Sequence, residues 1–199
     1  MNLEAFCWHE DVSHIGSRPE LLHPFLYKGY IYATTGRVLI RVPEGSFHGQ
    51  YKPFPKLLGM AASIKSLEYR KAVRGYPFPS TLPEQTTKKC DECDGSGICF
   101  NCACLNCEGK GLVPIVEGVW VGGALLCLTY LRVIHENTTN PRLYPFDTYT
   151  PVKFTAVDCE GLIMPMRRDA GYTKVLDISW PEGSKDEQGQ AQDPAQQAS

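Results

Sequence analysis

Six cysteines lie between residues 90 and 107, and their spacing suits metal binding. They form three CxxC pairs, in which two residues separate the cysteines. A CxxC turn points two thiolates toward one position, and two such turns supply the four ligands of a tetrahedral zinc ion. The first and last pairs share the longer repeat CxxCxGxG, whose glycines permit positive φ and let backbone N–H groups approach the sulfurs. The predicted zinc ligands are Cys90, Cys93, Cys104 and Cys107.

The middle pair, Cys99 and Cys102, lies between the two repeats. It can join a second zinc site or a shared cluster, so we expect one zinc ion and leave a second open. Ordinary thiols or a redox CxxC pair are the alternatives to metal. A redox pair is typical of a strand-to-helix junction, whereas these cysteines lie in a glycine-rich segment. That segment has too few large apolar residues to build a core, so we interpret metal binding as its source of folding energy.

The repeats CDECDGSG and CLNCEGKG resemble the cysteine-rich region of the J-domain co-chaperones, which uses four such units in pairs. The resemblance covers residues 90–111 and implies zinc binding. No J-domain signature accompanies it. A zinc module that binds polypeptides, with no connection to DNA, is therefore an alternative function.

The sequence outside residues 76–113 resembles one module of the bacterial replicative sliding clamp, the β subunit of DNA polymerase III. Residues 17–39 contain SRPELL and ATTGRVL, where clamps have an RP-x-L segment and ATDG-x-R-L. Residues 122–134 are placed like the second helix of the clamp module, and PVKF and GLIMPMR resemble its closing strands. The resemblance implies a DNA-clamp-like module of two βαβ-type halves, interrupted by a zinc ribbon or knuckle.

In the clamp family, two of these segments help to line a pocket that accepts short peptides from polymerases and repair proteins. Methionine and leucine suit an adaptable apolar groove of this kind. Plain packing of two hairpins is the alternative interpretation. The matching positions are Thr35, Gly36, Arg37, Leu39, Met164, Pro165, Met166 and Arg167.

The chain also departs from the clamp pattern. It carries one module where a replicative clamp chain has three, and Thr35 stands where clamps have an acid. A ring-forming processivity factor is therefore not implied. Whether several copies assemble is left open.

Positive charge is concentrated between residues 51 and 74, where Glu68 is the only acidic residue. Aromatic residues alternate with the basic ones, as on nucleic-acid-binding surfaces. A solvated helix face is the alternative. The candidate DNA-binding residues are Lys52, Lys56, Lys65, Arg70, Lys71 and Arg74.

Composition and motifs exclude several function classes. The 199 residues carry a net charge of −2, which does not favour a generic nucleic-acid binder. No Walker loop, GxGxxG, GxSxG or HExxH motif is present, so we expect no enzyme. A zinc ion with three thiolates and one water would be the catalytic alternative. The N-terminal sequence lacks the apolar core of a signal peptide, and no apolar run reaches membrane-helix length, so we expect a cytoplasmic protein.

Apolar patterning predicts the elements that must position these residues. Residues 30–42 and 152–164 each indicate a β-hairpin. Helical spacing of apolar residues occurs between residues 57 and 67. A second apolar stripe predicts a helix that ends at Asn137 and contains Leu125, Leu128, Leu131 and Ile134.

The fold class expected from these observations is α+β, with the zinc insert placed between two clamp-like halves. The predicted parts are residues 1–75 (first half), 76–113 (insert), 114–180 (second half) and 181–199 (a disordered, apolar-poor tail). We predict that the chain is a non-enzymatic, zinc-binding, clamp-like protein, of a kind that a phage or mobile element could encode. It acts in or on DNA replication by binding DNA or a protein partner.

Overall fold

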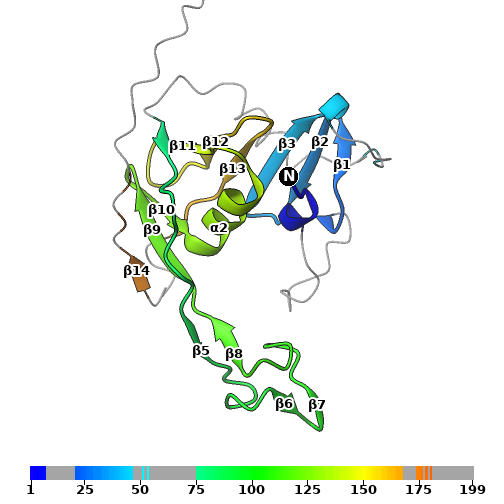
Figure 1. Cartoon of the computed structure of the whole chain (residues 1–199), viewed down its shortest axis with the longest axis vertical. Coiled ribbons are helices and arrows are strands. Elements are labelled where there is room, and N and C mark those ends of the chain that lie inside the picture. Colours follow the sequence, from blue (N-terminus) through cyan, green and yellow to red (C-terminus); the bar gives the residue numbers. More distant parts are fainter. Residues whose placement is uncertain are drawn as a thin grey trace, which may run out of the picture.

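The computed structural model describes residues 1–7, 21–46, 51, 53, 75–167, 174–176, 178 and 180. Within this part of the chain, two larger sheets and one α-helix form a body, and a narrow arm extends from it (Figure 1). The mixture of sheets and one helix agrees with the α+β prediction at the level of fold class.

The main sheet is antiparallel and has seven strands in the order β1-β2-β3-β13-β12-β11-β4. Six of these strands form two meanders, one from each half of the chain. In each meander the three strands follow one another in the sequence and pair with their sequence neighbours. The bounds are Phe25–Tyr27 (β1), Tyr30–Thr34 (β2), Val38–Pro43 (β3), Arg142–Tyr144 (β11), Val152–Thr155 (β12) and Glu160–Ile163 (β13).

The two meanders join through their last strands, because β3 pairs with β13. Val38 lies opposite Ile163, and Leu39 lies opposite Leu162. Outward from this junction, the strands of each meander therefore follow in reverse sequence order. They are β3, β2 and β1 on one side and β13, β12 and β11 on the other. Both hairpins predicted from the apolar patterning are present, although the second begins its return strand at Glu160. The seventh strand, β4 (Tyr76–Pro77), extends the sheet beyond β11 and falls within the range predicted for the insert.

A smaller sheet pairs β9 (Glu117–Val121) with β10 (Ala124–Cys127), and β14 (Lys174–Leu176) adds in parallel to β9. The prediction of a helix through Leu125 was wrong, since this residue is paired with Trp120 in the β9–β10 hairpin. Gly122 and Gly123 both have positive φ and form the turn of that hairpin, so strand pairing overrides the local helical pattern. The helix α2 (Leu128–Asn137) begins directly after β10 and ends at the predicted residue.

The two faces of the main sheet have different environments because side chains alternate along each strand. Ile31 and Ile40 belong to the large core, which α2, β9 and β10 also share. Helix α2 contributes Leu128, Leu131 and Ile134 to that core, as expected for its buried stripe. The opposite face carries a smaller apolar cluster of Phe25, Tyr32, Leu39 and Leu162.

The cysteine arm comprises residues 87–114 and projects from the body (Figure 1). Its stalk pairs β5 (Thr87–Lys89) with β8 (Leu112–Pro114), and a hairpin of β6 (Ile98–Cys99) and β7 (Cys102–Ala103) lies farther along it. Most of the arm is built from turns rather than long strands. It therefore depends on its cysteines for internal packing.

Two short 3-10 helices complete the described elements, Glu4–Phe6 (η1) and Glu44–Ser46 (η4). The helical spacing predicted between residues 57 and 67 and the tail at 181–199 lie outside the described residues. No helix in the described part of the chain is long and apolar enough to cross a membrane.

Candidate metal centre

The sulfurs of Cys90, Cys93, Cys104 and Cys107 form one buried cluster in the cysteine arm. All four sulfurs lie within 4.8 Å of one another. The distance is 3.8 Å between the sulfurs of Cys90 and Cys104 and 3.7 Å between those of Cys93 and Cys107. Metal–sulfur bonds of about 2.3 Å in a regular tetrahedron require sulfurs about 3.8 Å apart. The cluster therefore has the dimensions of a four-thiolate metal site and can hold a metal ion.

The two CxxCxGxG repeats adopt the same backbone conformation around this cluster. In the first repeat, Gly95 N–H donates to the carbonyl of Cys90, and in the second Gly109 N–H donates to the carbonyl of Cys104, both at 3.1 Å. The repeats also exchange hydrogen bonds. Cys90 N–H donates to the carbonyl of Gly111 at 2.9 Å, and Cys104 N–H donates to that of Gly97 at 2.8 Å. The duplicated sequence thus produces two equivalent turns that support each other.

The last glycine of each repeat is required by close packing as well as by backbone conformation. Gly97 has φ of +77°, and a Cβ there would lie 2.3 Å from the carbonyl oxygen of Gly109. Gly111 has φ of +73°, and its Cβ would lie 2.2 Å from the carbonyl oxygen of Gly95. Because Gly97 and Gly111 have no side chain, the backbones of the two repeats can approach each other. The N–H groups of these glycines can then reach the cysteine sulfurs.

Hydrogen bonds to sulfur favour the thiolate form that a metal ion needs. Gly97 N–H donates to the sulfur of Cys93, and Gly111 N–H donates to that of Cys107, both at 3.2 Å. The Asn106 amide donates to the sulfur of Cys90 at 3.3 Å, a contact that was not predicted although Asn106 stands inside the last CxxC pair. These donors partly replace the water that burial removes from the sulfurs.

The thiol pKa values shift in opposite directions within the cluster. Burial raises the pKa of the Cys104 thiol, but hydrogen bonds from the Cys107 backbone and from neighbouring groups outweigh it and lower that pKa to about 7. Burial raises the pKa of the Cys107 thiol to about 11, despite the donor at Gly111. Four adjacent thiolates repel one another, so the full set of charges needs a cation to compensate it.

Cys99 and Cys102, predicted as further metal ligands, are not members of the four-sulfur cluster. Cys99 packs against the cluster from outside, and the adjacent Cys104 thiol raises the pKa of Cys99 to about 11. Cys102 is exposed, and its thiol donates to the carbonyl of Cys99 at 2.9 Å. Among the described residues, no other group of three or more Cys, His, Asp or Glu side chains has the geometry of a metal site.

A buried carboxylate holds the root of the cysteine arm against the body. Glu117 in β9 is 1% exposed and accepts hydrogen bonds from the backbone N–H and the hydroxyl of Thr86, at 3.1 and 2.7 Å. Lys174 in β14 completes the arrangement with an ion pair of 3.2 Å. Sequence analysis did not single out Glu117, because its partners lie far from it in the chain.

The two segments predicted to bind a peptide lie side by side in the structure. Thr35 and Gly36 form the turn between β2 and β3, and Gly36 has φ of +80°. The carbonyl of Arg37 accepts a hydrogen bond of 2.8 Å from Met164 N–H. This bond continues the β3–β13 ladder by one residue, and strand alternation then places Met164 on the face that carries Leu39. Met164 is 38% exposed, so this edge of the apolar face is accessible.

Met166 belongs to a different environment. It is 8% exposed and packs with Leu125 and Cys127, and its N–H donates to the carbonyl of Leu125 at 2.7 Å. Leu39 packs instead with Tyr32 on the other side of the sheet. Of the eight predicted residues, the turn, Leu39 and Met164 lie toward one face of the main sheet, whereas Met166 packs against the smaller sheet. Pro165 is half-buried and Arg167 is exposed.

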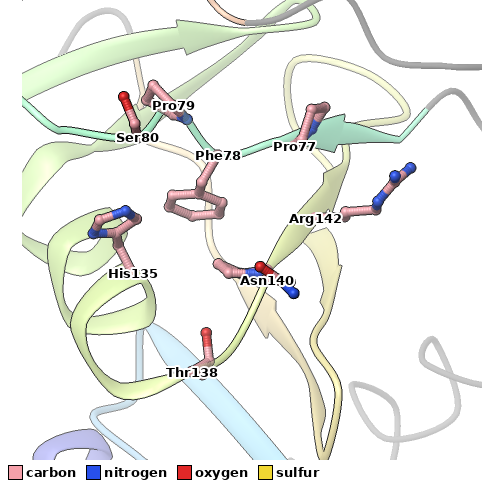
Figure 2. Close-up of a pocket in the computed structure, with 9 residues that line it drawn as sticks. Pro77, Phe78, Pro79, Ser80, His135, Thr138, Asn140 and Arg142 are labelled. Carbon is pink, nitrogen blue, oxygen red and sulfur yellow. The ribbon is translucent and has the colours of Figure 1, made fainter.

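A separate pocket of about 440 Å³ lies between the C-terminal end of α2 and the segment after β4. Figure 2 shows Phe78 and His135 among the residues that line it, and their rings stack with centroids 5.8 Å apart. Asn140 and Arg142 supply polar groups to its lining. None of these residues was predicted as part of a site, and their separation in the sequence gave no signal for the pocket.

The six candidate DNA-binding residues lie outside the described residues, so that prediction stays a prediction. Comparison with known proteins adds no assignment: no protein-family model, no curated protein and no solved structure matches the chain.

Proposed function

We propose that the protein is a non-enzymatic, zinc-binding, sliding-clamp-like protein that acts in or on DNA replication by capturing a short peptide of a replication partner. The observation that carries the proposal is the hydrogen bond between Met164 N–H and the carbonyl of Arg37. It brings the MPM segment beside the ATTGR turn, the two segments that line the peptide pocket of clamps. The two segments are far apart in the sequence, so it is the folding of the chain that brings them together.

The arrangement of the main sheet supports the clamp-like fold. Each half of the chain contributes a three-stranded antiparallel meander, and the meanders meet at β3 and β13. In the second half, the β9–β10 hairpin and the helix α2 precede the meander. Two similar halves that share one sheet are what an internally duplicated clamp module requires.

Zinc is the metal that suits the cysteine cluster best. Four buried thiolates in a tetrahedral arrangement select zinc or iron, and a closed set of four protein ligands is typical of structural zinc. A catalytic zinc ion keeps a position for water, which the four-sulfur set does not leave. These features support a structural ion that stabilises the arm and a protein without enzymatic activity.

The surface beside Arg37 offers an accessible apolar side chain to a peptide. Met164 is 38% exposed there, at the edge of a buried apolar cluster that contains Tyr32, Leu39 and Leu162. Methionine adapts its shape to different apolar side chains, which suits recognition of short peptides. A bound peptide would bury Met164 against its own apolar side chains.

The test is binding of a fluorescent peptide from the C-terminus of a bacterial replicative DNA polymerase, measured by anisotropy. We expect the wild-type chain to bind it and Met164→Glu to weaken binding at least about tenfold, since a buried charge opposes docking. Val157→Glu is the matched control, because Val157 is an exposed apolar residue in the turn after β12. Equal loss in both variants, or no binding by the wild type, contradicts the proposal.

Duplex DNA is the other partner to be measured with the same protein. Native mass spectrometry with and without a short duplex reports the zinc count, the subunit number and DNA binding together. An oligomer that retains DNA indicates that the clamp-like fold works on DNA directly. A zinc-bound monomer that does not bind DNA indicates an adaptor that binds protein.

A second candidate function is a J-protein-like module that binds polypeptides through the cysteine arm. The observation that favours it is the exposure of large apolar side chains on the arm. Phe100 is 102% exposed at the tip of the β6–β7 hairpin, and Leu105 is 87% exposed between the two cysteines of the second repeat. Large apolar side chains that are exposed to solvent on a small arm favour contact with an apolar segment of another polypeptide.

The two candidates predict opposite results for one pair of variants. A reduced, unfolded protein serves as the probe, and binding to the full chain is followed by co-sedimentation. Polypeptide capture by the arm requires that Phe100→Ser lowers binding and that Met164→Glu leaves it unchanged. Loss of binding in Met164→Glu alone favours the clamp-like groove.

A further inference from the structure

The pair left over from the metal cluster, Cys99 and Cys102, has the geometry of a reversible thiol site. The two residues are direct cross-strand partners in the β6–β7 hairpin. Only Phe100 and Asn101 separate them, with φ of +50° and +63°, which is the pattern of a two-residue type I′ turn. The turn fixes the two cysteines opposite each other.

We propose that Cys99 and Cys102 are a modification site, at which a hydroperoxide forms an intramolecular disulfide while the four buried cysteines keep their metal ion. The proposal is independent of the clamp-like function. It depends only on the cysteine arm and on a reactive thiol pair beside the cluster.

The spacing of the hairpin permits this bond. Directly opposed residues in an antiparallel ladder have Cα atoms about 4.5 to 5.5 Å apart, and disulfides form when that distance is about 4.4 to 6.8 Å. The Cys102 sulfur already lies 2.9 Å from the carbonyl oxygen of Cys99, so its side chain turns toward its partner. A disulfide thus needs side-chain rotation and no rearrangement of the arm.

Accessibility separates this pair from the other cysteines of the chain. Cys102 is exposed and Cys99 half-buried, whereas all seven others are buried. The side chains of Cys7, Cys127 and Cys159 are buried in the body and are therefore shielded from a dissolved oxidant. A small oxidant in solution therefore reaches Cys102 first.

The reaction balances with one hydroperoxide. The Cys102 thiolate attacks the peroxide O–O bond, takes one oxygen to become a sulfenic acid and releases water or an alcohol after protonation. The Cys99 sulfur then attacks the Cys102 sulfur, and the hydroxyl group leaves as water. Two thiols have lost two electrons and two hydrogens, and the peroxide has accepted them. An exposed disulfide of this kind is reduced again by cellular thiols.

The metal ion decides which thiol partner is used. Cys99 also packs against the four-sulfur cluster, to which Cys104 belongs. A bond between these two would remove one of the four ligands, and that bond is disfavoured while the ion holds Cys104. Cys102 is not a ligand in the four-sulfur cluster, so it is free of this restriction. Oxidation should therefore close the hairpin and leave the cluster intact.

The test uses the full, zinc-loaded chain, treated with hydrogen peroxide and then with catalase. Native mass spectrometry should show the loss of two hydrogens with the zinc ion retained, and peptide mapping after thiol blocking should find the Cys99–Cys102 bond. Dithiothreitol should restore the original mass. In Cys102→Ser and in Cys99→Ser, this disulfide should be absent and zinc binding should be unchanged.

Three outcomes overturn the proposal. One is a disulfide that joins other cysteines, in particular Cys99 to Cys104. Another is loss of zinc in step with oxidation, which would mean that the ligands react first. The third is oxidation of the wild type at the same rate and to the same products as Cys102→Ser.

Discussion

The carboxylate of Glu117 accepts two hydrogen bonds from Thr86, one from its backbone N–H at 3.1 Å and one from its hydroxyl at 2.7 Å. Glu117 belongs to the body, and Thr86 is the residue before the first strand of the cysteine arm. The Thr86 carbonyl in turn accepts a hydrogen bond of 2.8 Å from Ile115 N–H, on the returning side of the stalk. The buried carboxylate of Glu117 therefore holds Thr86 directly and Ile115 through Thr86. These two residues belong to the two sides of the stalk, at the point where it leaves the smaller sheet.

Glu117→Ala should lower the free energy of unfolding of the body by about 1–3 kcal/mol, because it removes the acceptor of the Thr86 N–H and the ion pair with Lys174. Urea unfolding at neutral pH measures the change. Glu44→Ala is the control, since Glu44 is an exposed acid in η4. The zinc content should not change in either variant. Equal stability of Glu117→Ala and wild type would contradict the role of Glu117 as an anchor.

Acid should remove the stabilisation that Glu117 and Glu160 contribute. Burial raises the pKa of Glu117, but hydrogen bonds from Thr86 and the ion pair with Lys174 outweigh it and hold the pKa below its ordinary value. Burial likewise opposes ionisation of Glu160, and Lys153 and Arg41 outweigh it. A carboxyl group whose pKa is lower in the folded state stabilises the fold above its unfolded pKa, and this stability is lost as the pH falls through the folded value.

The stability difference between wild type and Glu160→Gln should therefore be largest near neutral pH and should shrink on acidification below about pH 4. Urea midpoints across this range test the prediction. A difference that stays constant with pH would show that the ion pairs with Lys153 and Arg41 do not stabilise the charged form.

Gly97→Ala should weaken metal binding at least about tenfold. Its Cβ would lie 2.3 Å from the backbone of Gly109, in addition to the cost of about 1–2 kcal/mol for a side chain at positive φ. Gly29→Ala is the matched control: Gly29 has φ of +76°, but no atom lies within 4 Å of the added Cβ. Competition with a zinc-binding dye measures affinity. Gly29→Ala should bind zinc normally, and equal behaviour of the two variants would exclude packing between the repeats as the reason for Gly97.

Removal of the metal should unfold the cysteine arm and leave the body mostly folded, because the arm packs around its cysteines and the body has its own core. Cys93→Ser and treatment with a strong chelator should give the same result. Hydrogen exchange resolved by segment is the measurement: protection should fall in residues 87–114 and persist in β2 and β12. Loss of protection throughout the chain would mean that the metal centre is integral to the core.

Local patterns in the sequence predicted the elements that form between near neighbours. The β2–β3 hairpin, the end of α2 and the paired cysteine turns all depend on residues within a few positions of one another. The helix predicted through Leu125 did not form there, because an apolar residue fits the buried stripe of a helix and the buried face of a strand equally well. The two glycines before it form the turn of a hairpin, a signal that outweighs the stripe.

Local spacing was enough to predict that four cysteines in two equivalent turns could share one metal ion, because the CxxC spacing and the following glycines set that geometry within each repeat. The different environments of Leu39 and Met166, and the contact of Glu117 with the arm, become visible in the folded chain. The folded chain also keeps Cys99 and Cys102 outside the cluster. These outcomes depend on which distant strands pair, as β3 does with β13. Such pairing is selected by burial and hydrogen bonding over the whole sheet, which no short segment specifies.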